Sequence, residues 1–182
     1  VSAIYRDLSG ALWVGTGSDY EVEAGGLNVF DGTTGQFTRY LHDPQDRHSL
    51  SNNHARSIYE DRTGTLWIGT GWMDKGGLNR FDRATETFTR YMYDSNDSTS
   101  INHDVIQCIY EDKSGRLWVG TAKGMNLLDK KNDNFHHYYF KDPFKLKDGS
   151  ILAICENQLT GDVLIGSEFP GLWKCDLDKN VL

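Results

Sequence analysis

Hydrophobic and polar positions along the chain alternate in short runs that predict β-strands. Residues 65–70, TLWIGT, place apolar or small side chains on both faces of a strand, because neighbouring residues of a strand point in opposite directions. A strand of this kind is covered on both sides. Residues 56–60 form another β-branched and aromatic run, and residues 61–64 begin with aspartate and end with glycine, as type I turns prefer. Together with strands at 77–82 and 87–93, these segments predict one antiparallel sheet.

This pattern of four strands recurs along the chain. The string around Trp67 returns around Trp13 and Trp118 and more loosely around Leu164, at spacings of 54, 51 and 46 residues. Four short strands in a repeat of about 40 to 50 residues are typical of a β-propeller blade. We therefore predict an all-β fold, a partial β-propeller of about four blades, each a four-stranded antiparallel meander. Because the tryptophan recurs at one position of the repeat, we interpret it as core packing.

The four copies predict a single domain, residues 1–182, with blades at about 1–53, 54–104, 105–149 and 150–182. The last copy continues only six residues beyond Asp176, too few for a turn and a full strand, so we expect its blade to be incomplete. The chain begins with Val1, and we interpret it as a fragment of a larger protein. Blade faces that a closed ring buries would be exposed at both ends, so we expect self-association through those open edges.

The succession of strings within one copy is similar to a known repeat. Residues 58–91 read as an isoleucine-rich start, then ED-x-x-G-x-LW-[IV]-GT, a short gap, GGLN-x-FD and F-x-x-Y. This succession resembles the two-component regulator propeller repeat, strongly in the first three copies and weakly in the last. The resemblance implies the extracytoplasmic sensor region of a bacterial hybrid two-component histidine kinase, in which such repeats usually build seven-bladed rings. It also implies a periplasmic location, oligosaccharide-type ligands and no catalytic activity in this segment.

The charge of the chain restricts its partners. The sequence has 19 basic and 26 acidic residues, for a net charge of -7. A surface short of basic residues is poorly suited to the phosphate backbone of nucleic acids, and the same shortage argues against an anionic membrane surface. No run of 18 apolar residues is present, so we predict no direct membrane insertion by this segment. The expected partner is a small molecule or an oligosaccharide.

The geometry of a meander predicts which face binds that partner. Turns between the first and second and between the third and fourth strands lie on one face, here called the turn face. The other turns and the connections between blades form the opposite loop face, which carries longer inserts at residues 17–25 and 71–76. Binding residues collect on loops held by a rigid scaffold. An aromatic plate flanked by hydrogen-bonding groups suits a sugar ring, and on that ground we predict ligand-binding roles for Tyr20, Glu21, Glu23, Trp72, Asp74, Lys75, Glu168 and Phe169.

Other groups with catalytic or metal-binding character have simpler interpretations. The carboxylate pairs at 60–61 and 111–112 recur before a turn glycine, which indicates turn capping. The histidines at 136–137 are neighbours on a predicted strand and point in opposite directions, so they are poorly placed to share one metal. Residues 94–98 resemble a calcium loop but lack its glycine and its closing glutamate. We predict no catalytic residue, no metal and no cofactor.

Two other functions remain open from the residues alone. Similar propellers include a streptogramin lyase, and a lyase site would need a histidine and carboxylates that converge near the central axis. No histidine recurs at one strand position of these copies. The remaining alternative is a scaffold for protein interaction, which needs no small-molecule site.

Overall fold

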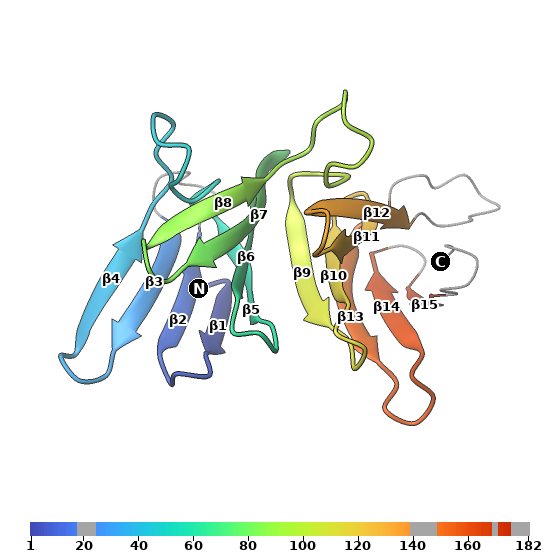
Figure 1. The fold of residues 1–182 in the computed structure, drawn as a ribbon, viewed down its shortest axis with the longest axis horizontal. Coiled ribbons are helices and arrows are strands. Elements are labelled where there is room, and N and C mark those ends of the chain that lie inside the picture. The colour runs from blue at the N-terminus through green and yellow to red at the C-terminus, as the bar shows by residue number, and fades with distance from the viewer. Residues whose placement is uncertain (18–24, 139–148, 169–170, 176–182) are drawn as a thin grey trace.

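The structure is a computed structural model that describes residues 1–17, 25–138, 149–168 and 171–175. These residues form fifteen β-strands in four antiparallel sheets, which we call blades 1 to 4 in chain order (Figure 1). Blade 1 contains β1 (Ala3–Arg6), β2 (Leu12–Thr16), β3 (Gly26–Asp31) and β4 (Gln36–Tyr40), and blade 2 contains β5 (Ala55–Glu60), β6 (Leu66–Trp72), β7 (Lys75–Asp82) and β8 (Thr87–Tyr91). Blade 3 contains β9 (Ile106–Glu111), β10 (Leu117–Thr121), β11 (Gly124–Asp129) and β12 (Asn134–Tyr138), and blade 4 contains β13 (Ile151–Glu156), β14 (Val163–Ser167) and β15 (Leu172–Lys174).

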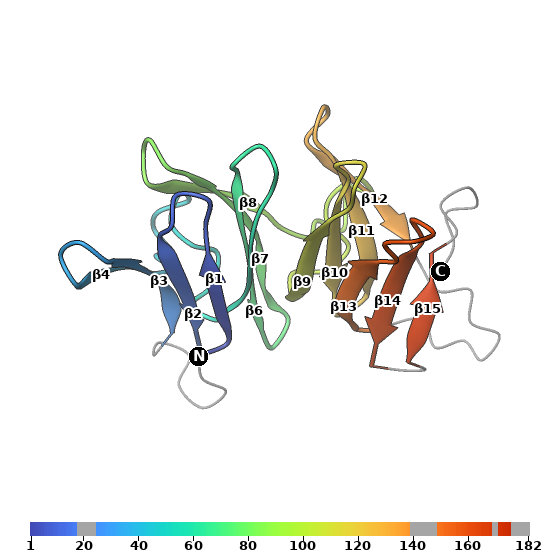
Figure 2. The same cartoon turned by 90° about the horizontal axis from the view of Figure 1, so that it is seen from below.

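The order of strands confirms the predicted architecture. In every sheet the strands lie in chain order, each paired antiparallel to the next, as in a meander. The described part of blade 4 has three strands. The first strands of successive blades contact one another, and the blades stand side by side in chain order, as Figure 2 shows. The described sheets do not close into a ring, so the fold is a partial β-propeller. The described residues contain no helix that could cross a membrane.

The hydrophobic core lies between the blades, because each sheet carries apolar side chains on both faces. Trp13 packs in one cluster with Ile58 and Phe81 of blade 2. Trp67 occupies the corresponding cluster between blades 2 and 3, and Trp118 the cluster between blades 3 and 4. All three indoles are at most 2% exposed. The prediction that the recurring tryptophan is core packing is therefore confirmed.

The glycine two residues after that tryptophan lets neighbouring blades approach closely. A Cβ atom at Gly69 would lie 2.5 Å from the Ile106 side chain of blade 3, and one at Gly120 would lie 2.7 Å from the Ile151 side chain of blade 4. Such distances are far shorter than van der Waals contact. The glycine is thus needed for packing between blades, since any side chain there would push the next blade away.

The free face of blade 1 exposes apolar side chains that the repeat elsewhere buries. Ile4 is 67% exposed, whereas Ile58 and Ile109, at the same repeat position, are each 8% exposed. Leu8 and Phe37 of blade 1 are also exposed, as are Leu152, Leu159 and Leu172 of blade 4.

We expect these exposed end faces to drive association between copies of the chain. Burial of apolar surface contributes about 25 cal/mol per Å², so light scattering is expected to give an average mass that rises with protein concentration. The double variant Ile4→Lys, Phe37→Lys should weaken the association, since Phe37 is also exposed whereas Phe88 and Phe135, at the same repeat position, are buried. A mass equal to one chain at every concentration, for the wild type, would contradict this prediction.

Candidate functional site

Trp72 and Asp74 of the loop face belong to a tight hairpin. Strands β6 and β7 extend far enough to pair Trp72 with Lys75, which leaves Met73 and Asp74 as a two-residue turn. Both turn residues have positive φ, 46° and 62°, as a type I′ turn requires. The segment that the sequence suggests as a loop insert is therefore a regular hairpin. Trp72 and Lys75 are paired residues of β6 and β7, so the backbone positions from which their side chains extend are fixed by the sheet.

Trp72 is held against the connection that enters blade 2. Its indole lies beside the imidazole of His54, with ring centroids 5.6 Å apart and planes inclined by 38°. The backbone joins the same two segments, because the Gly71 N–H donates to the His54 carbonyl at 3.0 Å. Trp72 itself is half-buried. It therefore forms a supported aromatic surface on the loop face.

Asp74 reaches from the hairpin to the connection that enters blade 3. Its Oδ1 lies 3.3 Å from Nε2 of His103, whose side chain is 8% exposed, while the Asp74 side chain is 88% exposed. Nδ1 of His103 accepts a hydrogen bond from the Val105 N–H at 3.1 Å, so Nε2 carries the ring proton and donates to Asp74. Burial, together with the charge of Lys123, lowers the pKa of His103 against the opposing effect of Asp74. The neutral imidazole is therefore favoured.

Of the remaining predicted site residues that the structure describes, Lys75 belongs to this hairpin and Glu168 does not. Lys75 is exposed at the start of β7. Glu168 is exposed two blades away, after β14, with its N–H donating to the Ser150 carbonyl at 3.0 Å. The structure thus places Trp72, Asp74 and Lys75 on one hairpin and Glu168 elsewhere on the fold. Tyr20, Glu21, Glu23 and Phe169 lie outside the described residues.

The aspartate of each predicted carboxylate pair caps its own turn, as predicted, whereas the glutamate binds the turn of the preceding blade. Oδ1 of Asp61 accepts hydrogen bonds from the N–H groups of Thr63 and Thr65 at 3.0 and 3.1 Å. Oδ2 accepts from Nε1 of Trp67 at 3.0 Å. Asp7 and Asp112 accept corresponding bonds, one from the N–H four residues later and one from the indole of the tryptophan in the same blade. Each aspartate therefore joins its own turn to the buried tryptophan of the same blade.

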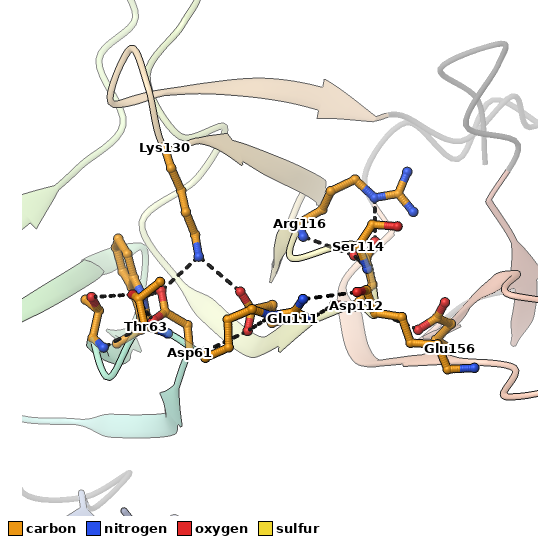
Figure 3. Close-up of polar contacts among 12 residues, drawn as sticks. Asp61, Thr63, Glu111, Asp112, Ser114, Arg116, Lys130 and Glu156 are labelled. Carbon is orange, nitrogen blue, oxygen red and sulfur yellow. Dashed lines mark hydrogen bonds and ion pairs between the residues drawn. The ribbon is translucent and has the colours of Figure 1, made fainter. Parts of the chain in front are cut away.

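A cation from the next blade also binds this aspartate, a contact that the repeat pattern did not predict. Nζ of Lys130, in the turn after β11, lies 2.9 Å from Asp61 of blade 2 and 3.1 Å from Glu111 of blade 3 (Figure 3). The second oxygen of Glu111 accepts the Arg62 N–H of blade 2 at 2.8 Å. Lys130 and Glu111 together connect two blades across the turn face. These contacts also confirm that both kinds of short turn lie on one face.

The same bridge occurs one junction earlier with arginine in place of lysine. Arg83 lies 2.9 Å from Asp7 of blade 1 and 3.0 Å from Glu60 of blade 2. Glu60 accepts the Leu8 N–H at 2.6 Å. The sequence signal for this bridge is a basic residue directly after the aspartate that ends the third strand, as in RFDR and LLDK.

At the junction between blades 3 and 4, the buried aspartate binds a cation from its own blade. Asp112 binds Nε of Arg116, from its own blade, at 2.5 Å (Figure 3). Arg116 occupies the position of Ala11 and Thr65 in the other copies. Glu156 of blade 4 still accepts the Lys113 N–H at 2.9 Å. A cation thus reaches the buried aspartate in all three cases, but between blades 3 and 4 it comes from the same blade.

The segment resembling a calcium loop is a pair of side-chain-capped turns. Asp94 accepts the Asn96 N–H at 2.9 Å, and Asp97 accepts the Thr99 N–H at 2.8 Å. His137 lies 2.6 Å from the carbonyl of Ser100 in the same connection. Within the described ranges, no group of three or more histidine, cysteine, aspartate or glutamate side chains is placed to hold a metal ion.

Comparison with known proteins relates this fold to bacterial regulators. The model of the two-component regulator propeller family matches residues 49–72 and 100–123. Histidine kinase P4 of Formosa agariphila is 36% identical over 98 residues, which cover 53% of this chain and 7% of that protein. The chain therefore spans a small part of this relative.

One of two solved structures compared with this chain is similar in fold. PorZ, an essential surface component of the type IX secretion system of Porphyromonas gingivalis, is 18% identical with a TM-score of 0.65, over 94% of this chain and 25% of that one. An extracellular domain assigned to a hybrid two-component system of B. thetaiotaomicron is 23% identical with a TM-score of 0.49, over 97% of this chain and 27% of that one. The likeness to PorZ concerns the fold alone. The match to the two-component regulator propeller family falls on the two segments that begin with the entry to blades 2 and 3 and end in the second hairpins of these blades.

Proposed function

We propose that this chain is a ligand-binding part of an extracytoplasmic sensor in a two-component signalling protein. The family match and the shared stretch with a histidine kinase support a sensor histidine kinase as the full-length parent. On that assignment the propeller lies in the periplasm and passes ligand occupancy to the rest of the protein. The segment itself acts by binding, without catalysis.

The observation that carries the proposal is the supported indole of Trp72. An indole face packs against the axial C–H groups of a sugar ring, while neighbouring polar groups bond its hydroxyls from the side. Asp74 and Lys75 extend from the same hairpin and supply an acceptor and a donor. We therefore propose an oligosaccharide as the ligand of the loop face.

The turn-face carboxylates favour binding over lyase chemistry. Asp61 and Glu111 are engaged by turn N–H groups and by Lys130, and they lie on the face opposite Trp72. A general acid or base needs a proton that it can exchange with a substrate. Groups engaged in this way serve the fold.

Titration with a panel of neutral and acidic oligosaccharides tests the proposal. Isothermal calorimetry is expected to detect binding by the wild type, and Trp72→Ala should weaken it about tenfold, since loss of a stacked aromatic costs about 1 kcal/mol beyond burial. Met73→Ala is the matched control, because Met73 is exposed in the same turn and should leave affinity unchanged.

Two results would count against the proposal in different ways. Equal affinities of the wild type and Trp72→Ala would show that the hairpin is not the site. A wild type that binds no member of the panel would reject the ligand class.

A further inference from the structure

The connections that enter blades 2 and 3 contain the same pair of turns, in residues 43–50 and 94–101. In both, an aspartate carbonyl accepts the N–H of a second aspartate, and the carbonyl of that aspartate accepts the N–H of a serine. These distances are all 3.2 Å in residues 43–50 and 3.1 Å in residues 94–101. Each segment also accepts a backbone N–H from the fourth strand of the blade that follows, from Phe88 at 2.8 Å and from Phe135 at 2.9 Å. The two segments, here called the first and the second oxygen loop, are therefore equivalent parts of the repeat.

The first oxygen loop encloses the guanidinium of Arg90, which extends from β8. Nε of Arg90 donates to the Ser49 carbonyl at 2.7 Å. Nη2 donates to the Ser49 hydroxyl and to the carbonyls of Asp43, Asp46 and Leu50, the three carbonyls at 3.4, 2.7 and 3.1 Å. Burial lowers the pKa of Arg90, and the negative charges of Asp46 and Asp43 act in the opposite direction. The loop thus binds one singly charged group through neutral oxygens, with two carboxylates close enough to stabilise its charge.

The second oxygen loop meets a histidine at the same place. The register of the outer strands puts His137 of β12 where β8 has Arg90. Nε2 of His137 donates to the Ser100 carbonyl at 2.6 Å, as Nε of Arg90 does in the first loop, because a carbonyl oxygen can only accept. No described residue of blade 3 donates to the four oxygens that correspond to the contacts of Nη2. Their hydrogen bonds lie within the loop itself, and they are the Ser100 hydroxyl and the carbonyls of Asp94, Asp97 and Ile101.

The second oxygen loop keeps the features that bind a cation in the first and is open to solvent. Residues 94–99 are exposed, and Ser100 is half-buried. Asp94 and Asp97 stand at the positions of the two carboxylates that stabilise the charge of Arg90. Carbonyl oxygens can replace the water shell of a potassium ion. A calcium ion, by contrast, is usually held by several carboxylates directly, and here Oδ1 of each aspartate caps a turn. Neutral oxygens with two carboxylates nearby therefore suit a single positive charge.

We propose that the second oxygen loop binds a singly charged cation of the size of potassium or ammonium, at the position that Nη2 of Arg90 takes in the first loop. Its ligands are the carbonyls of Asp94, Asp97 and Ile101 and the hydroxyl of Ser100, and water completes the shell on the exposed side. The bound cation ties the connection to the outer part of blade 3, as Arg90 ties the first loop to blade 2. The site uses no residue of the Trp72 hairpin and does not depend on the function proposed for it.

Exchange of the arginine and the histidine between the two loops tests the proposal. Melting temperatures are measured in potassium chloride and in choline chloride, whose cation is too large for the site, both at an ionic strength of about 0.15 M. The wild type is expected to melt about 2–4 °C higher in potassium chloride, the shift given by a ligand a few times above its Kd. His137→Arg supplies a guanidinium from the protein itself. This variant should lose the potassium shift and should melt higher than the wild type in choline chloride.

Three further variants locate the cation. Arg90→His opens the first loop to the same ion, so its potassium shift should be about twice that of the wild type, since separate sites add. Ser100→Ala removes one ligand of the proposed site and should reduce the shift. Ser49→Ala is the matched control, because it removes the same turn hydroxyl from the first loop and should leave the shift unchanged.

Ammonium chloride and methylammonium chloride distinguish a free ion from the amino group of an organic molecule. A shift with potassium and ammonium alone assigns a free ion, whereas a larger shift with methylammonium assigns an amine. The proposal is overturned if the wild type melts at one temperature in all four salts. It is likewise overturned if His137→Arg keeps the full potassium shift, since the ion then binds elsewhere. If His137→Arg does not fold, an undiminished shift in Ser100→Ala overturns it.

Discussion

Trp67→Ala is expected to lower the free energy of unfolding by about 3–5 kcal/mol, the usual cost of removing a buried tryptophan. Trp67 is 2% exposed and packs in the cluster between blades 2 and 3. Its ring lies 6.0 Å from that of Tyr91, and its Nε1 donates to Asp61. The alanine variant loses the contacts of both blades and leaves a cavity between them. Because small domains are marginally stable, much of the variant should be unfolded at 37 °C.

Urea denaturation followed by circular dichroism measures this loss. Trp67→Phe is the matched control, since it keeps an aromatic ring in the cluster and loses the hydrogen bond to Asp61. It should fall between the wild type and the alanine variant. An unchanged denaturation midpoint for Trp67→Ala would contradict the packing of this indole between two blades.

Asp61→Ala is expected to have an effect of similar size, about 3–5 kcal/mol, because it leaves several donors at a buried position without their acceptor, each at a cost of about 1–3 kcal/mol. The variant leaves the Trp67 indole N–H and the turn N–H groups without their acceptor, and it leaves Lys130 with Glu111 alone. Asp82→Ala is a useful control. Asp82 also caps a turn, through the N–H groups of Ala84 and Thr85, but it is exposed, so its loss should be smaller.

Acid titration of unfolding gives an independent check on Asp61. Burial raises its pKa, but the hydrogen bonds from Thr63, Lys130 and Trp67 outweigh burial and lower the pKa from 3.8 to about 2. Because the pKa is lower in the folded state, the ionised carboxylate stabilises the fold above about pH 4, and this contribution is lost as the pH falls towards 2. The wild type should therefore lose more stability than Asp61→Ala over that interval. Parallel curves for the two proteins would show that Asp61 is not the group responsible.

The fold could be predicted from the sequence because its rules are local. A period of two along each strand and an aspartate-to-glycine turn recur in each of the first three copies, and each copy needs only its own residues to form a sheet. The bridges between blades are different. Lys130 and Asp61 are 69 residues apart and meet only after two blades have packed. No periodicity within one copy could reveal that contact.

The candidate site was predictable to the same limited extent. Trp72, Asp74 and Lys75 are close in sequence, so a single hairpin brings them together. Their neighbours His54 and His103 come from the connections that enter blades 2 and 3. Such features follow from three-dimensional packing and not from residue type.

The bridge made by Arg83 and Lys130 has a consequence for how such proteins lengthen. Each of these cations comes from the later blade and binds the aspartate of the earlier one. The glutamate of the later blade likewise accepts a backbone N–H from the turn of the earlier blade. Blade 2 therefore carries a cation and a glutamate that bind the blade before it, and an aspartate and a turn N–H that are bound by the blade after it. If blade 2 were duplicated in frame, Arg83 of the second copy would lie beside Asp61 of the first copy and could form the same ion pair. Tandem duplication can thus add whole repeats to a gene without any compensating mutation at the new seam.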